Sequence, residues 1–112
     1  MKELSTNIIK ILEDNDFSYD EVMEYNGKFF VEINQYTPEG EDWCETIWFD
    51  GTEQGFVAAV KYRADNYDVE EEAEIYIDMR GRNGVPDSIR ALIEDAEWKK
   101  ETLEDLSRDL AA

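Results

Sequence analysis

The sequence predicts an α+β fold in which an N-terminal helix and a three-stranded antiparallel meander precede C-terminal helices, the last one long. Three observations lead to this fold class. Apolar residues recur at helical spacing at both ends of the chain, an Asn-Gly pair separates two strand-like segments, and one apolar seam continues through residues 86–112. The length of 112 residues fits a single domain, residues 1–112, with one hydrophobic core.

The first helix is expected over residues 4–13, and three strands are expected at residues 22–25, 28–33 and 42–50. Asn26-Gly27 predicts a hairpin between the first two strands, because a type I′ turn requires positive φ at both central positions. In the third strand Trp43, Ile47 and Phe49 alternate with Cys44, Thr46 and Trp48, which is the period of a β-strand. Together these strands predict the meander.

Two further helices are expected after the sheet. Thr52 is a suitable N-cap for the second helix, and Asp68 with Glu71 resembles a capping box for a third helix that extends to about Arg80. Ala73, Ile75, Ile77 and Met79 also alternate, which leaves a strand as the alternative for this segment. Gly81 is expected to end the third helix in the left-handed conformation, and Asn83-Gly84 to form a turn.

The long C-terminal helix is expected from Pro86 onward. Its apolar seam consists of Ile89, Leu92, Ala96, Lys99, Leu103, Leu106 and Leu110. This 3,4 spacing is that of a heptad repeat, interrupted only at Lys99. Roughly 24 helical residues would extend about 36 Å, so part of the helix is expected to project beyond the domain.

Both faces of the predicted sheet carry apolar residues. One face contains Phe29, Val31, Ile33, Ile47 and Phe49, and the other contains Phe30, Tyr36, Cys44 and Trp48. Either helices cover both faces, or the Phe30/Trp48 face is open and serves as a binding surface. We expect the N-terminal helix to cover it.

The charge balance limits the classes of function. Asp and Glu number 29, Lys and Arg number 11, and His is absent, which gives a net charge of −18. Absence of His excludes a His-based triad, imidazole acid-base catalysis and His-containing zinc sites. The negative charge opposes direct binding to nucleic acid or anionic lipid and favours basic protein surfaces, including the basic clefts of nucleic-acid enzymes.

Cysteine use and hydropathy indicate the compartment. Cys44 is the only cysteine, the first residues lack the apolar segment of a secretory signal, and acids interrupt every hydrophobic stretch. A membrane helix needs about 18 to 20 uninterrupted apolar residues. We therefore expect a cytoplasmic protein that does not bind a membrane.

The acids of the two last helices are the candidate partner-binding residues. They are Glu70, Glu71, Glu74, Asp78, Glu94, Glu97, Glu101, Glu104 and Asp105. Four helical residues rise about 6 Å, which is close to the phosphate spacing along one DNA strand, so these rows can imitate a phosphate backbone. The alternative is that the acids only keep the domain soluble.

No catalytic residue, metal ligand or cofactor is predicted. The acidic run at residues 14–16 resembles the start of a calcium loop, but Tyr19 and Tyr25 stand where the loop needs Gly and a bidentate Glu. The carboxylate pairs Glu70/Glu74 and Glu94/Asp95 are interpreted as parts of solvated helix faces and not as a catalytic acid and base. Cys44 lies beside acids that raise a thiol pKa, and Arg80, Arg82 and Arg90 are expected to contact a helix end or neighbouring acids.

Three segments carry a resemblance to a known group of proteins: GEDW at residues 40–43, IWFDGT at 47–52 and RGRNGVPDSIRAL at 80–92. Over residues 20–110 the chain resembles small acidic accessory proteins of Firmicutes phages and conjugative elements. The resemblance implies no catalytic residues. It implies a setting in which acidic inhibitors of restriction or CRISPR nucleases occur.

Two functions follow as expectations. The first is an acidic protein-binding module without enzymatic activity, which imitates DNA and inhibits a host defence nuclease or a nucleic-acid-binding protein by occupying its basic groove. The second is a structural or adaptor module that forms a homodimer or binds a partner helix through the seam of the C-terminal helix, with Lys99 selecting the register.

Overall fold

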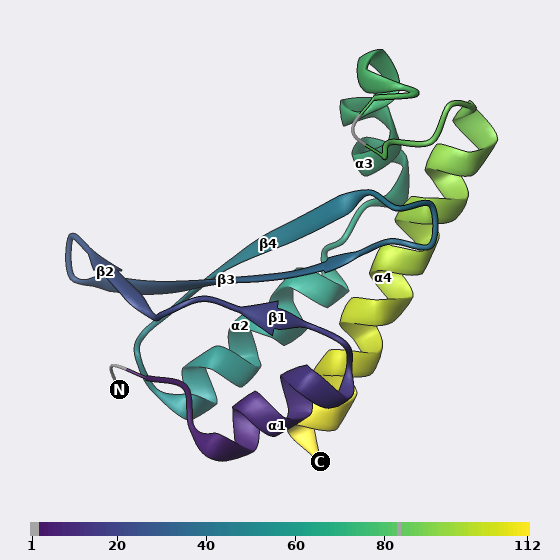
Figure 1. The fold of residues 1–112 in the computed structure, drawn as a ribbon. Helices are drawn as coiled ribbons and strands as arrows, with labels where there is room; N and C mark the ends of the chain where they lie inside the picture. The colour runs from purple at the N-terminus through teal and green to yellow at the C-terminus, as the bar shows by residue number, and fades with distance from the viewer. Residues whose placement is uncertain (1–2, 83) are drawn as a thin grey trace.

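The computed structural model describes residues 3–82 and 84–112 (Figure 1). Its elements are α1 (Thr6–Asp14), β1 (Ser18–Tyr19), β2 (Met23–Tyr25), β3 (Lys28–Tyr36), β4 (Asp42–Phe49), α2 (Glu53–Asp65), α3 (Val69–Ile75), the 3₁₀ helix η1 (Ile77–Met79) and α4 (Ile89–Ala111). The predicted α+β class, with an N-terminal helix, an antiparallel sheet and a long last helix, is confirmed.

The sheet is built around β3. This strand pairs antiparallel with β4 along one side, and with β2 and β1 in succession along the other. Asn26 and Gly27 both have positive φ, 51° and 77°, which confirms the hairpin between β2 and β3. The predicted meander is present, and the two-residue strand β1 is the element that the sequence pattern did not indicate.

Each α-helix begins with a side-chain cap. The side chains of Ser5, Thr52, Asp68 and Ser88 each accept a hydrogen bond from the backbone N–H three residues further on. The caps predicted at Thr52 and Asp68 are confirmed. The last helix begins at Ile89, after its Ser88 cap, rather than at Pro86.

The third helix is shorter than predicted. It ends at Ile75 and is followed by η1, and the strand alternative is wrong. Arg80 (φ −53°, ψ 135°) and Gly81 (φ 75°) then form a type II turn, in which the N–H of Arg82 donates to the carbonyl of Met79 over 3.1 Å. Gly81 therefore supplies the positive φ of this turn instead of capping α3. In the predicted Asn83-Gly84 turn, Asn83 lies outside the described residues.

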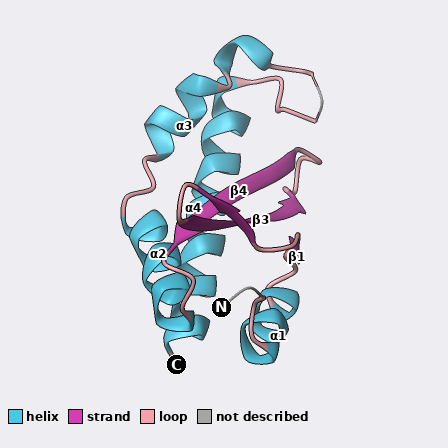
Figure 2. Cartoon of the chain, turned by 90° about the vertical axis from the view of Figure 1, so that its left-hand side faces the viewer, coloured by secondary structure: helices cyan, strands magenta, loops and turns pink. Residues whose placement is uncertain are grey.

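The main hydrophobic core lies on one face of the sheet. Ile8 and Leu12 of α1 join Val31 and Ile33 of β3, and the buried side chains of α2 and α4, in a single cluster. Figures 1 and 2 show α1, α2 and α4 on the same side of the strands. The expectation that the N-terminal helix covers the Phe30/Trp48 face is therefore wrong, because the apolar stripe of α1 is used in the main core.

Helix α4 runs along most of the molecule and contacts all the other α-helices. Its first half packs against α3, and its second half packs against α2 and α1 (Figure 1). At ~1.5 Å per residue its 23 residues span about 34 Å, against a longest dimension of 41 Å for the whole chain. The expected projection of this helix beyond the domain is wrong, because α3 packs on its first half while α1 and α2 pack on its second half, where Leu103, Leu106 and Leu110 join the core.

Gly84 lies directly against the turn between β3 and β4. Its φ is 79°, and a Cβ at this position would lie 2.3 Å from the carbonyl oxygen of Gly40. We expect Gly84→Ala to lower the free energy of unfolding by about 2 kcal/mol, through backbone strain and this clash. Urea denaturation measures the loss. Gly27→Ala is the matched control, since Gly27 has φ 77° and no atom within 4 Å of its Cβ position; equal losses in the two variants would show that the Gly40 contact is unimportant.

Candidate functional site

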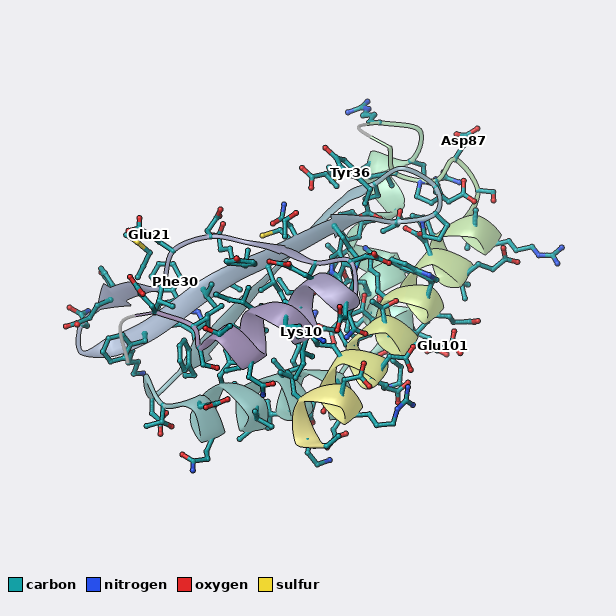
Figure 3. All side chains as sticks on the ribbon, turned by 60° about the horizontal axis from the view of Figure 1, so that its bottom comes forward. Lys10, Glu21, Phe30, Tyr36, Asp87 and Glu101 are labelled. Carbon is teal, nitrogen blue, oxygen red and sulfur yellow. The ribbon has the colours of Figure 1, made fainter. Side chains whose placement is uncertain are left out.

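The acids predicted on α4 lie on one exposed stripe of the helix. Glu94, Glu97, Glu101, Glu104 and Asp105 are all exposed. Because successive residues are rotated by about 100°, the five side chains fall within about 100° of the helix circumference and about 16 Å of its length. Figure 3 shows Glu101 projecting outward from α4. The predicted row on this helix is thus assembled on one side of it.

The acids predicted on the third helix are also exposed. Glu70, Glu71 and Glu74 lie on α3 and Asp78 lies on η1. Helix α3 packs against α4, with Glu72 and Tyr76 contacting Lys99. The two acidic rows therefore belong to neighbouring helices, each pointing away from the contact between them.

Most of this negative charge has no cation beside it. Ion pairs among residues 3–82 and 84–112 engage seven of the 29 acids. Of the nine predicted residues, Glu94 pairs with Arg90 at 3.1 Å and Asp105 with Arg108 at 2.8 Å, both in exposed positions. Exposed pairs of this kind neutralise little. The acidic surface of α3, η1 and α4 consequently keeps a strongly negative potential.

A cluster of buried charges was not predicted. The ammonium of Lys99 is 2.9 Å from Glu41 and 3.6 Å from Glu72, and it lies 4.6 Å from the centre of the Tyr76 ring. Lys99 is 2% exposed and Glu41 is 4% exposed. These contacts join α4 to α3 and to the turn between β3 and β4. The feature of the sequence that indicated this cluster is Lys99 itself, because it is a cation in an apolar seam. A buried lysine needs a carboxylate partner.

Asp95 belongs to the same buried cluster. The pair Glu94/Asp95 was read as a solvated face, but only Glu94 faces solvent, and Asp95 is 4% exposed. Burial, and secondly a hydrogen bond to Glu41, raise the pKa of Asp95 to about 7, while Thr37 and Lys99 act in the opposite direction. Neither oxygen of Asp95 has a donor in good hydrogen-bond geometry. A protonated Asp95 could donate its single O–H to the Glu41 carboxylate, which would give one of its two oxygens a partner and lower the number of buried negative charges.

A second buried carboxylate lies on β4. Glu45 is 7% exposed and accepts hydrogen bonds from Arg63 of α2, at 2.5 and 3.1 Å, and from the Trp43 indole at 2.9 Å. The Arg63 guanidinium also lies 4.6 Å above the Tyr67 ring. Glu45 therefore links Arg63 of α2 to β4, and this group holds α2 against the sheet. In the sequence, Glu45 could have been recognised as the single acid among the core-facing residues of its strand.

The Phe30/Trp48 face of the sheet is open. Trp48 is 47% exposed and Tyr36 is 71% exposed, and the Phe30 and Trp48 rings pack with centroids 4.6 Å apart. Cys44 is exposed on the same face, and desolvation, followed by the nearby acids, raises the pKa of its thiol. Of the two arrangements considered for this face, the uncovered one is present.

The leucine seam of α4 packs inside the chain. Leu103 and Leu106 are fully buried, and Leu110 is 8% exposed. Lys99 contributes to the buried charge cluster rather than to a helix pair. A partner helix therefore has no access to these three leucines in the folded chain, although Ile89 at the start of the seam is 49% exposed. The adaptor alternative stays a prediction.

The Arg-rich segment after η1 makes local contacts. The Arg80 guanidinium donates to the Ile77 carbonyl over 3.0 Å, at the end of the preceding helical turn, and Arg90 pairs with Glu94. These are the internal partners expected for the two residues. Within residues 3–82 and 84–112, no group of His, Cys, Asp or Glu side chains has the arrangement of a metal site.

In the part of the chain that the structure describes, none of the helices is both long and apolar enough to cross a membrane. Comparisons with known protein families, curated proteins and solved structures found no match to this chain. The resemblance to proteins of phages and conjugative elements therefore stays a prediction.

Proposed function

We propose that this protein is an acidic binding module whose α3, η1 and α4 carboxylates dock on a basic protein surface, where they compete with nucleic acid. The observation that carries the proposal is the exposed stripe of five acids on α4, beside four more on α3 and η1. Among the described residues, Glu94 and Asp105 are the only two of these nine that pair with arginines. The predicted cytoplasmic location, where nucleic-acid-binding enzymes are abundant, fits this function.

The rigidity of the two helices supports this function. The buried Lys99 contacts fix α3 against α4, so the carboxylates are presented on a preformed surface. A preformed charged surface loses less conformational entropy on binding than a flexible acidic tail. Carboxylates that project from a helix at intervals of about 4.5 to 6 Å also match the repeat of a phosphate backbone.

Charge reversal of the α4 stripe should abolish the interaction. The chain is used as bait in a cell lysate, and the proteins recovered are identified by mass spectrometry. We expect basic nucleic-acid-binding proteins at about 0.1 M salt and their loss at about 1 M, where the Debye length falls from ~10 to ~3 Å. The variant with Glu97, Glu101, Glu104 and Asp105 all changed to Lys should bind the recovered partner at least about tenfold more weakly.

The matched control reverses the four exposed acids Glu3, Glu21, Glu24 and Glu39 to Lys. Each reversal adds two positive charges, so both variants move from −18 to −10. If only net charge matters, the two variants lose affinity equally and the α4 surface is not the binding site. Recovery of neutral or acidic partners alone at low salt also contradicts the proposal, and displacement of nucleic acid from the recovered partner tests the competition directly.

A further inference from the structure

The outer edge of β4 has no partner strand. The sheet order places β4 at the end of the sheet, paired only with β3 among the residues that the structure describes. The strand is eight residues long, and its pairing with β3 runs without a break from Phe29↔Phe49 to Tyr36↔Asp42. An unbroken edge of this length is a template on which another extended chain can form hydrogen bonds.

The backbone groups that face outward can be identified from the register. Asp20 N–H donates to the carbonyl of Glu32, so the even-numbered residues of β3 bond toward β1 and β2, and its odd-numbered residues bond toward β4. Their partners in β4 are also odd-numbered, as in the pair Val31↔Ile47. The N–H and C=O groups of Cys44, Thr46 and Trp48 therefore point away from the sheet.

Apart from the charges of Asp42 and the inward-pointing Glu45, the sequence of β4 has few features that protect an edge strand. Protected edge strands carry Pro, Lys, a bulge or an early end, whereas Asp42–Phe49 contains no Pro, Gly, Lys or Arg and has no bulge in its register. Its only charged side chains are the acids Asp42 and Glu45, and Glu45 is turned into the core. The edge is thus open to an added strand that does not bring further negative charge.

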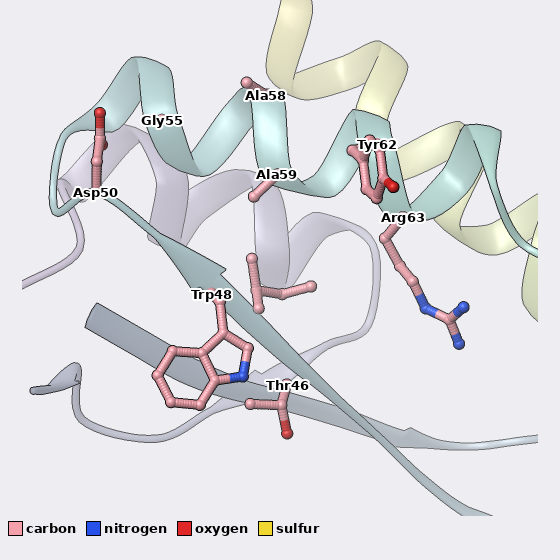
Figure 4. A pocket seen from close by; sticks show the side chains of 9 residues that line it. Thr46, Trp48, Asp50, Gly55, Ala58, Ala59, Tyr62 and Arg63 are labelled. Carbon is pink, nitrogen blue, oxygen red and sulfur yellow. The ribbon is translucent and has the colours of Figure 1, made fainter. Parts of the chain in front are cut away.

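A groove runs along this edge and supplies room for side chains. It lies between β4 and α2, has a volume of about 620 Å³ and is lined on the helix side by Ala58, Ala59 and Tyr62 (Figure 4). Trp48 and Ile47 form part of the strand side. A strand added to β4 would direct every second side chain into this groove and the others toward the open Phe30/Trp48 face.

We propose that β4 binds an extended segment of a basic partner protein by strand addition, with alternate apolar side chains in the α2 groove and alternate Lys or Arg side chains over the open face. Charge identifies the occupant: Asp42 and Glu32 lie on the open face, and Asp50 lines the groove. Arg63, the cation in the groove, is already bonded to Glu45. A second copy of this chain is the less favourable occupant, because each copy carries −18 and would bring its own Asp42 and Asp50 to the contact.

This site is separate from the acidic surface in the proposed function, and each can fail without the other. The probe is a synthetic peptide of seven alternating Val and Lys residues with blocked ends. Its control has the same sequence with N-methyl groups on alternate residues, which removes backbone donors and keeps the charge. We expect the first peptide to bind at least about tenfold more tightly, since the second loses several backbone hydrogen bonds.

Amide NMR locates the complex. The amides of Cys44, Thr46 and Trp48 should shift and become protected from hydrogen exchange when the unmodified peptide is added. The α4 variant with Lys at positions 97, 101, 104 and 105 should keep this affinity within about threefold. Equal binding of the two peptides, or shifts confined to α4, would mean that the peptide is held by charge alone and would overturn the proposal.

Thr46→Pro removes one outward N–H and blocks strand addition, and it should abolish peptide binding, while Thr46→Val should retain it. Thermal melting checks that both variants are folded. If Thr46→Pro does not fold, the comparison of the two peptides on the unaltered chain decides the question. A wild-type dimer in analytical ultracentrifugation whose contact protects the β4 amides would assign the edge to a second copy and contradict the basic partner.

Discussion

Lys99→Met is expected to lower the free energy of unfolding by about 3 to 5 kcal/mol. The substitution keeps most of the side-chain volume but removes the only ion-pair partner that Glu41 and Glu72 have within the described residues. An unpaired buried carboxylate has to be protonated or hydrated, and either route weakens the fold. Urea denaturation followed by circular dichroism measures the loss.

Lys61→Met is the matched control. Lys61 pairs with Asp65 at 2.7 Å, but both side chains are exposed, so its loss should change stability by only ~0.5 kcal/mol. Adding Glu41→Gln to Lys99→Met should recover part of the stability, because one buried charge is then removed together with its partner. A loss in Lys99→Met no larger than that in Lys61→Met would show that the buried pairs do not hold α3 and the β3–β4 turn on α4.

Asp95→Asn is expected to stabilise the protein at about pH 8 and to leave its stability almost unchanged at about pH 3. The pKa of Asp95 is about 7 in the folded chain and 3.8 in its ordinary state, so the folded chain binds more protons between these values. Its stability therefore falls as the pH rises from about 4 to about 7, and the contribution is lost above that range. Asn cannot ionise, and its amide can donate to Glu41, so the variant escapes this loss.

The expected gain at about pH 8 is about 1 to 3 kcal/mol. Thermal melting of both proteins at several pH values measures it, and Glu94→Gln is the control because Glu94 is adjacent in sequence but exposed. Parallel pH curves for wild type and Asp95→Asn would show that Asp95 is ionised throughout. The idea that Asp95 shares a proton with Glu41 would then be wrong.

Local patterns in the sequence were sufficient to predict most secondary structure. The Asn26-Gly27 turn, the Thr52 cap and the alternation in β4 each depend on residues close together in the chain, and each is confirmed. All nine acids of the predicted binding surface are exposed for the same reason, since the helical period separates them from the apolar stripe.

Contacts between distant segments could not be predicted in this way. Glu41 and Lys99 are 58 residues apart, and no local pattern pairs them. Glu94 and Asp95 are chemically similar neighbours, yet one faces solvent and the other the core, because α3 and the β3–β4 turn meet α4 at Asp95. Helix α1 packs on the sheet face where its own apolar side chains become most buried. The sequence places apolar residues on both faces of the sheet, so it does not show which face that is.

The place of α4 in the chain determines when the fold can form. Residues 103–110 supply the side chains that close the core over α1, α2 and the strands, and they follow all those elements in the sequence. During synthesis the ribosome completes the sheet and α2 well before it makes this helix. The nascent chain therefore exposes Val31, Ile33 and Phe56 to chaperones and proteases until α4 has emerged from the ribosome and packed on them.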